Sequence, residues 1–237
     1  MNPDVRSPTF SAGPRQNASA IPSRVEMVKA DSPERPEVEG FIRASFAAAY
    51  GARLHHFLPD LMSVRDARRA LLAVLGLRPA ASGALFLEQY LECPVEGALG
   101  RALRREVSRA ELVEVGNLAV AHSGGARWLI AALTAYLKGA GVGWAVFTAV
   151  PALRNAFVRM GIELMTLAPA DPRRLTEAER AQWGRYYDSG PLVMAASVEQ
   201  AFDALTAFLR RTNDRYRLIG LWKHAYAAGI FAEVEPA

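Results

Sequence analysis

The sequence predicts an α/β protein in which helices cover both faces of a layered sheet. Residues 111–167 alternate between apolar strand-like and amphipathic helical segments, in the order strand, glycine turn, helix, strand, helix, strand. Strand-like runs at residues 24–28, 61–65 and 69–77 precede this segment, and strands followed by alternating strands and helices are typical of α/β layers. With 237 residues, of which 51% are hydrophobic and 22% charged, the chain has the composition of a soluble globular protein.

The N-terminal region is predicted as a tail followed by a strand and a helix. Residues 1–23 are rich in Pro, Ser, Ala and Asn and lack the apolar core of a secretion signal, so we expect an unfolded tail. A short strand is predicted at 24–28 and a helix at 37–50, ended by Gly51 where a C-cap belongs. The helix is indicated by apolar residues spaced three and four apart, namely Val38, Phe41, Ile42, Phe46 and Tyr50.

The next segment is predicted as a hairpin followed by helical connections. Residues 61–65 and 69–77 have the alternation of two hairpin arms, although the alanine-rich start of the second arm also suits a helix. Residues 85–91 and 94–99 are predicted as a helix and a helix-containing connection. The chain then enters the central strand at Leu112.

The central segment contains a predicted anion site. An apolar strand at 111–120 is followed by the small-residue turn 122–127, which opens an apolar helix. A helix N-terminus presents unpaired N–H groups and the positive end of the helix dipole, and glycines let a phosphate approach these amides. A strand at 142–149, a helix at 151–160 and a strand at 162–167 follow.

The C-terminal part is predicted to add two helices around one more strand. Thr176 begins a helix to residue 183, because it forms a capping box with the glutamate three residues later. A last strand is predicted at 192–195 and an amphipathic helix at 198–211. We therefore expect one domain over residues 24–210, and residues 211–237 as a C-terminal extension.

Charge and cysteine content restrict the partners. The 28 basic and 24 acidic residues give a net charge of +4, which suits anionic partners such as CoA, an acidic carrier protein or a membrane surface but falls short of a nucleic-acid-binding protein. The single cysteine, Cys93, excludes an intramolecular disulfide, so a cytoplasmic location is expected.

No metal site and no membrane-spanning segment are expected. The only histidine pair is His55 and His56, whose side chains diverge as neighbours in regular structure, so a shared metal ion is not expected. No run approaches the roughly 18 apolar residues of a transmembrane helix, which excludes integral membrane association.

Four segments resemble the thermostable hemolysin family over about residues 38–205. They are Leu85-Phe-Leu-Glu-Gln-Tyr-Leu91, Val113-Glu-Val-Gly-Asn-Leu-Ala119, Val146-Phe-Thr148 and Trp183-Gly-Arg-Tyr-Tyr187. The order of elements in 111–167 also resembles the GNAT acyltransferase superfamily, in particular acyl-homoserine-lactone synthases and N-acyl amino acid synthases. The resemblance implies a central mixed sheet with a splayed central strand. It also implies an N-acyltransferase that moves an acyl group from acyl-CoA, or from the phosphopantetheine of an acyl carrier protein, to an amine or amino-acid-like acceptor.

Glu114 and Asn117 are the candidate catalytic residues. Period-two alternation places Glu114 on the face of Leu112 and Gly116, inside an apolar strand. A carboxylate buried there would have a raised pKa, which suits a general base for an amine nucleophile. The alternative is a salt bridge or hydrogen bonds within the sheet. Gly116-Asn117 replaces the Ser-Arg pair of the synthases.

The same resemblance implies residues that bind the acyl donor. They are Val115, Gly116, Leu118, Ser123, Gly124, Gly125, Ala126, Arg127 and Asn155. Gly116 marks either a bulge at which the strand splays or close packing against a helix. Asn155 either contacts the CoA arm or serves as a surface or capping residue.

Substrate binding is assigned by the resemblance to residues upstream and on the second strand. They are Asp60, Arg65, Glu88, Tyr90 and Thr148. For the carboxylates in this set, the alternative is ordinary solvation in a loop.

Two further functions remain open from the sequence. The name of the family that the chain resembles implies a membrane-active hemolysin. A catalytically inactive GNAT-like binding module is the other alternative, because a fold alone does not establish an activity.

Overall fold

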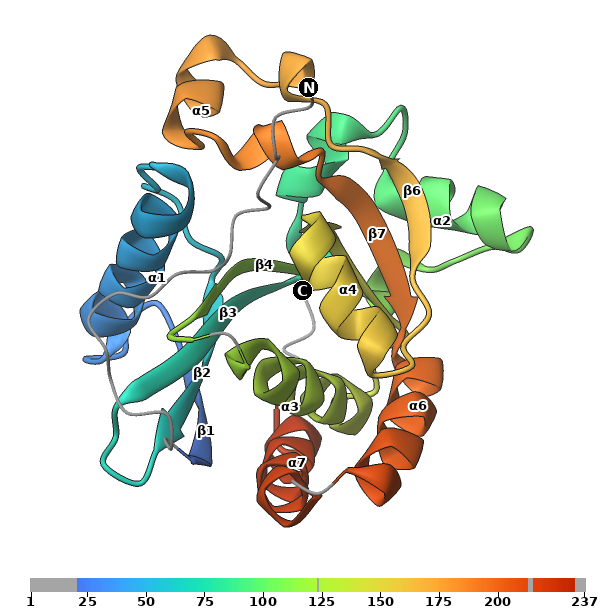
Figure 1. Cartoon of the computed structure of the whole chain (residues 1–237). Coiled ribbons are helices and arrows are strands. Elements are labelled where there is room, and N and C mark those ends of the chain that lie inside the picture. Colours follow the sequence, from blue (N-terminus) through green and yellow to red (C-terminus); the bar gives the residue numbers. More distant parts are fainter. Residues whose placement is uncertain (1–20, 123, 213–214, 233–237) are drawn as a thin grey trace, which may run out of the picture.

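A computed structural model describes residues 21–122, 124–212 and 215–232. The described strands form one mixed sheet in the order β1-β2-β3-β4-β5-β7-β6 (Figure 1). They are β1 (Pro22–Val28), β2 (Asp60–Asp66), β3 (Leu71–Pro79), β4 (Leu112–Val120), β5 (Trp144–Ala149), β6 (Met165–Pro169) and β7 (Leu192–Ser197). Only the β4–β5 pair is parallel. The predicted α/β class with a mixed sheet is confirmed.

Helices cover both faces of this sheet, as predicted. The largest apolar cluster joins one face to α3 (Gly125–Gly139), α4 (Pro151–Arg159), α6 (Val198–Arg211) and α7 (Arg215–Ile230). The opposite face carries two further clusters. One packs α1 (Arg35–Tyr50) on the β1–β3 end, and the other packs α2 (Val95–Leu103) with the 3₁₀ helix η2 (Phe86–Tyr90) on the β5–β7 end. In Figure 1, α1 lies to the left of β3 and β4, while α3 lies below β4 and α7 lies below α3.

Most predicted elements of the N-terminal half are present. α1 begins two residues earlier than predicted, because Pro36 fits the first turn, and it ends at Gly51, whose φ of 67° is the left-handed C-cap predicted for it. The hairpin is β2–β3, so the strand alternative is correct for the alanine-rich second arm. Of the predicted tail, residues 1–20 lie outside the described residues, and Ser23 belongs to β1.

The remaining predicted elements are also found, with shifted bounds. The segment 85–91 contains the 3₁₀ helix η2 and not an α-helix. The strand predicted at 162–167 is β6, which begins only at Met165, and the last strand extends to Ser197. α5 (Glu177–Gln182) has the predicted capping box, since the Thr176 hydroxyl accepts a hydrogen bond from the Glu179 amide at 3.2 Å and the Glu179 carboxylate accepts from the Thr176 amide at 2.9 Å.

β4 bulges and separates from β5, as the predicted fold requires. Val74 of β3 pairs with Ala119, whereas Gly76 pairs with Gly116, so β4 holds one extra residue between these pairs. Asn117 in this interval has a positive φ of 52°, so the bulge lies one residue beyond the predicted Gly116. Pairing between β4 and β5 stops at Val115 and Phe147, although both strands continue.

The predicted C-terminal extension contains a helix, α7, that was not expected from the sequence. α7 packs along α3 and against β1, and its Leu218, Leu221 and Ala225 are buried in the largest cluster. None of the helices in the described part of the chain is long and apolar enough to cross a bilayer.

Candidate active site

A cavity of about 1160 Å³ opens where β4 and β5 separate. Val115, Gly116 and Leu118 of β4 form part of its wall, and Thr148 of β5 faces them across the gap. The cavity continues on one side of the sheet toward the N-terminal end of α3 and along one face of α4, and on the other side toward η2 and the segment after α5. Four residues predicted from the sequence to contact donor or substrate are therefore brought together at the splay.

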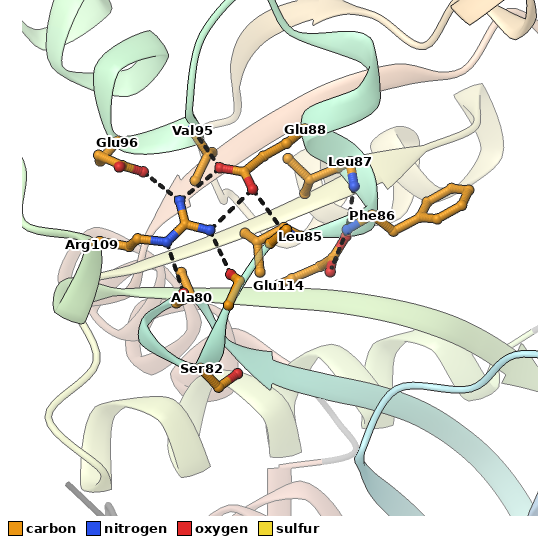
Figure 2. Close-up of polar contacts among 12 residues, drawn as sticks. Ala80, Ser82, Leu85, Phe86, Leu87, Glu88, Val95, Glu96, Arg109 and Glu114 are labelled. Carbon is orange, nitrogen blue, oxygen red and sulfur yellow. Dashed lines mark hydrogen bonds and ion pairs between the residues drawn. The ribbon is translucent and has the colours of Figure 1, made fainter. Parts of the chain in front are cut away.

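Glu114 is a buried carboxylate in the wall of this cavity. Its side chain is on the face of Leu112, as the alternation predicted, and the residue is only 4% exposed. Its two oxygens accept hydrogen bonds from the backbone amides of Leu87 at 2.9 Å and Phe86 at 3.1 Å (Figure 2). Burial raises the pKa of the Glu114 carboxyl, and the two amides and Arg78 oppose that shift. The carboxylate thus both borders the cavity and holds η2 against β4.

Asn117 fixes the bulge of β4. Its side-chain oxygen accepts a hydrogen bond from the Leu58 amide at 2.9 Å, which joins the bulge to the loop after α1. Asn is one of the few residues that adopts a positive φ at low cost, so the residue type fits the conformation. Asn117 also borders the cavity, and its observed contacts are those of a residue that shapes the wall.

One end of the cavity is basic and includes the start of α3. Gly124, Ala126 and Arg127 line it, together with His122 and with Arg159 from the end of α4. Ser123 lies outside the described residues.

Gly125 does not line this cavity. A Cβ at Gly125 would lie 3.2 Å from the Val120 Cβ, so this glycine permits close packing of α3 on β4. The amides of Gly124 and Gly125 donate to the His122 carbonyl, and Ala126 and Arg127 are the residues in the first turn of α3 that line the cavity. The predicted anion site stays a prediction, narrowed to these residues.

The opposite end of the cavity is lined by aromatic rings. They belong to Tyr50, Phe86, Tyr90, Trp183, Tyr186 and Tyr187. Tyr90 and Tyr187 join their hydroxyls at 2.5 Å, although 97 residues separate them in the sequence. Burial raises the pKa of Tyr187 to about 12 and that of Tyr90 further, so both hydroxyls stay protonated at neutral pH. Of these aromatic residues, only Tyr90 was predicted from the sequence to bind substrate. Trp183 and Tyr187 belong to a segment that carries the family resemblance.

Glu88, predicted to bind substrate, does not line the cavity. It accepts hydrogen bonds from Arg109 and from the amides of Leu85 and Val95, as Figure 2 shows. Burial would raise its pKa, but these hydrogen bonds outweigh burial and hold the pKa of Glu88 at about 2. Arg109 also bonds Glu96 and the carbonyl of Ala80, so Glu88 anchors the segment that carries η2.

Three other predicted site residues also lie away from the cavity. Arg65 is buried and forms ion pairs with Glu37 at 2.7 Å and Glu26 at 3.1 Å. These ion pairs fasten α1 to the β1–β2 pair. Asp60, at the start of β2, forms an ion pair with the exposed Lys29. Asn155 is exposed on α4, beside a separate shallow pocket. None of these positions could be found from spacing alone, since each depends on which side of an element faces the splay.

Comparisons with known proteins agree with this architecture. The sequence pattern of the family described as thermostable hemolysin matches residues 28–202. The fold is similar to that of TofI in an apo form (TM-score 0.53, 16% identity, covering 77% of this chain and 96% of that chain) and to that of the AHL synthase LasI (0.54, 10%, 80% and 96%). It is also similar to BjaI, a CoA-dependent acyl-homoserine lactone synthase solved with SAM and isopentyl-CoA (0.55, 14%, 81% and 89%). At these identities the likeness establishes the fold, which is GNAT-like. No curated protein matches the sequence significantly.

Proposed function

Because the chain belongs to the thermostable hemolysin family and has a GNAT-like fold, we propose that it is an N-acyltransferase. The proposed reaction moves an acyl group from acyl-CoA, or from an acyl carrier protein, to an amine or amino-acid-like acceptor. One observation carries this proposal. A cavity runs through the splay of β4 and β5 and has a buried carboxylate on its wall, a basic helix terminus at one end and aromatic rings at the other.

The basic end suits the anionic part of the donor. Ala126 and Arg127 belong to the first turn of α3, where the positive end of the helix dipole favours phosphate, and the guanidinium groups of Arg127 and Arg159 add positive charge. The gap between Val115 and Thr148 would hold the extended pantetheine arm, whose thioester would then lie near Glu114. The description of BjaI as CoA-dependent supports this class of donor.

Glu114 is proposed as the base. The amine nitrogen attacks the thioester carbonyl carbon, the C–N bond forms and the C–S bond breaks. The proton lost by the nitrogen passes to Glu114, directly or through water. Glu114 then returns a proton to the leaving thiolate by way of solvent, which gives the free thiol and restores the carboxylate. A carboxylate whose pKa is raised by burial accepts a proton better than an exposed one, so the position of Glu114 suits this role.

The test is transfer by the purified protein. A panel of acyl-CoAs of increasing chain length is mixed with a panel of amines, free thiol is followed with a chromogenic disulfide, and products are identified by mass spectrometry. We expect thiol release that depends on the amine and yields the matching amide. Folded protein that neither binds nor cleaves any acyl-CoA or acyl carrier protein thioester would refute the proposal.

Direct lysis of membranes is the competing function that the family name suggests. We expect purified protein without an acyl donor to leave dye-loaded anionic and neutral vesicles intact, and any lysis by cells that express it to require a lipidated amine product. Prompt dye release at low protein concentration, without added donor, would restore the hemolysin interpretation.

A further inference from the structure

The aromatic end of the cavity contains a pair of hydroxyl groups with an unused proton. Tyr90 ends η2 and Tyr187 lies in the 3₁₀ turn Tyr186–Ser189, and their oxygens are 2.5 Å apart. Two hydroxyls carry two protons, and their mutual hydrogen bond uses one. Within the described residues neither hydroxyl makes another hydrogen bond to protein, although both side chains border the cavity. The pair therefore presents one O–H donor to whatever fills this end.

The surroundings hold this donor in place. Tyr90 is 5% exposed, and its ring packs edge-on against Phe86, while the ring of Tyr187 packs edge-on against Trp183. Phe86 and Trp183 also contact each other, so the four rings close a circuit around the two hydroxyls. An O–H group that is polarised by a short hydrogen bond and held in an apolar wall is a stronger donor than a free tyrosine.

Charge decides which atom this donor would meet. An ammonium group has no lone pair and would be drawn to the carboxylates of Glu114 and Glu179, which also border the cavity. The remaining O–H of the hydroxyl pair needs a hydrogen-bond acceptor, and oxygen is the common acceptor atom. The anionic donor is assigned to the opposite, basic end, so this oxygen would belong to the acyl acceptor.

We propose that the Tyr90–Tyr187 hydroxyl pair binds a carbonyl or carboxylate oxygen of the acceptor, which makes the acceptor an amine with such an oxygen close to its nitrogen. α-Amino acids and amino lactones fall in this class, whereas simple alkylamines and polyamines do not. The inference rests on the proposed acyltransfer and specifies the substrate that the aromatic end selects.

The test compares matched amines that differ only in the oxygen-bearing group. The pairs are L-phenylalanine with phenethylamine, L-leucine with isopentylamine, and homoserine lactone with cyclopentylamine, each with one acyl-CoA at saturation. For wild-type protein, we expect kcat/KM to be at least about tenfold higher for the oxygen-bearing member of one pair. Because either hydroxyl alone still has a proton to donate, the test variant carries both Tyr90→Phe and Tyr187→Phe. This double variant should abolish the preference by lowering kcat/KM for that member alone, about tenfold.

Tyr136→Phe is the matched control, because Tyr136 is a half-buried tyrosine of α3 that does not border the cavity. It should keep the preference of the wild type. If the hydroxyl pair only stiffens the wall, the double Phe variant will lower kcat/KM equally for the two members of a pair, and the inference is overturned. Equal use of both members by wild-type protein also overturns it while leaving the acyltransferase intact. Absence of transfer to every amine overturns the proposed function and this inference with it.

Discussion

At the scale of single residues, Glu114 and Glu88 show how two nearby carboxylates acquire opposite properties. Both accept hydrogen bonds from backbone amides around η2. Glu114 is more deeply buried, and no arginine among the described residues is bonded to it, so burial dominates and its pKa rises. Glu88 is bonded by Arg109, and its pKa falls to about 2. Glu114 is therefore suited to take a proton, whereas Glu88 is suited only to hold structure.

Glu114→Gln should remove most activity and little stability. We expect kcat to fall about a hundredfold or more, the usual effect of losing a general base, while the variant stays folded because the amide oxygen still accepts one of the two backbone hydrogen bonds. Wild-type kcat should decline as the pH falls through the raised pKa of Glu114, and this limb should vanish in the variant. Parallel melting curves and pH–rate profiles test both points. Full activity in a stable Glu114→Gln protein would remove this residue from the mechanism.

Glu88→Gln should have the opposite signature. The folded-state pKa of Glu88 is lowered from 4.5 to about 2, so its contribution to stability is present above about pH 4.5 and is lost as the pH falls toward 2. We expect the variant to be less stable by about 2 kcal/mol at pH 7, because charge-assisted hydrogen bonds are lost, and the difference should shrink in acid. Urea unfolding between pH 2.5 and 7 measures this.

Glu92→Gln serves as the control for Glu88→Gln. Glu92 also pairs with an arginine, Arg174, but its side chain is 80% exposed. An exposed ion pair contributes little, so a change within about 0.5 kcal/mol is expected. If Glu92→Gln lowered the free energy of unfolding as much as Glu88→Gln, the explanation from burial would be contradicted.

At the scale of elements, the sequence predicts the strands and helices well where apolar periodicity is strong. The alternation of residues in 112–120 predicted which side chains of β4 share a face, and the spacing of apolar residues in 37–50 predicted which side of α1 is buried. α7 was missed because its sequence has no polar stripe. It packs on α3 by close approach of glycines, a contact that hydrophobic periodicity does not report.

The bulge of β4 should depend on the residue type at position 117. Asn117→Gly loses the hydrogen bond to Leu58 but accepts the positive φ, whereas Asn117→Ala loses the hydrogen bond and is strained as well. We expect both variants to be destabilised, and Ala to be worse than Gly by about 1 kcal/mol. Chemical denaturation of the three proteins tests the order. Equal stability of the Ala and Gly variants would show that backbone strain at this bulge is small.

At the scale of the whole molecule, the candidate site was only partly predictable. Residues on β4 and at the start of α3 could be found, because local pattern fixes their position relative to the splay. The aromatic end could not, since η2 and the turn after α5 are distant in sequence and meet only through the fold. Glu88 and Arg65 lie away from the cavity, which their sequence could not indicate either, because their partners come from other elements.

The junction between α3 and α7 should be sensitive to a single methyl group. A Cβ at Gly229 would lie 2.1 Å from the Tyr136 carbonyl oxygen, so Gly229→Ala must push the helices apart. We expect a loss of about 2–3 kcal/mol. Gly220→Ala on the same helix has open space around it and should be neutral or stabilising by up to about 1 kcal/mol, since alanine favours helix. Thermal unfolding of both variants is the measurement, and equal melting temperatures would contradict the packing argument.

The cavity that crosses the sheet at the splay has a consequence for the order of events. Its basic end and its aromatic end lie on opposite sides of β4 and β5, so neither substrate has to leave before the other arrives. Cys93, the only cysteine of the chain, does not border the cavity and cannot carry the acyl group between two half-reactions. Initial velocities at varied concentrations of both substrates should therefore give intersecting double-reciprocal lines, the pattern of a ternary complex. Parallel lines would mean that the acyl group is first transferred to the protein.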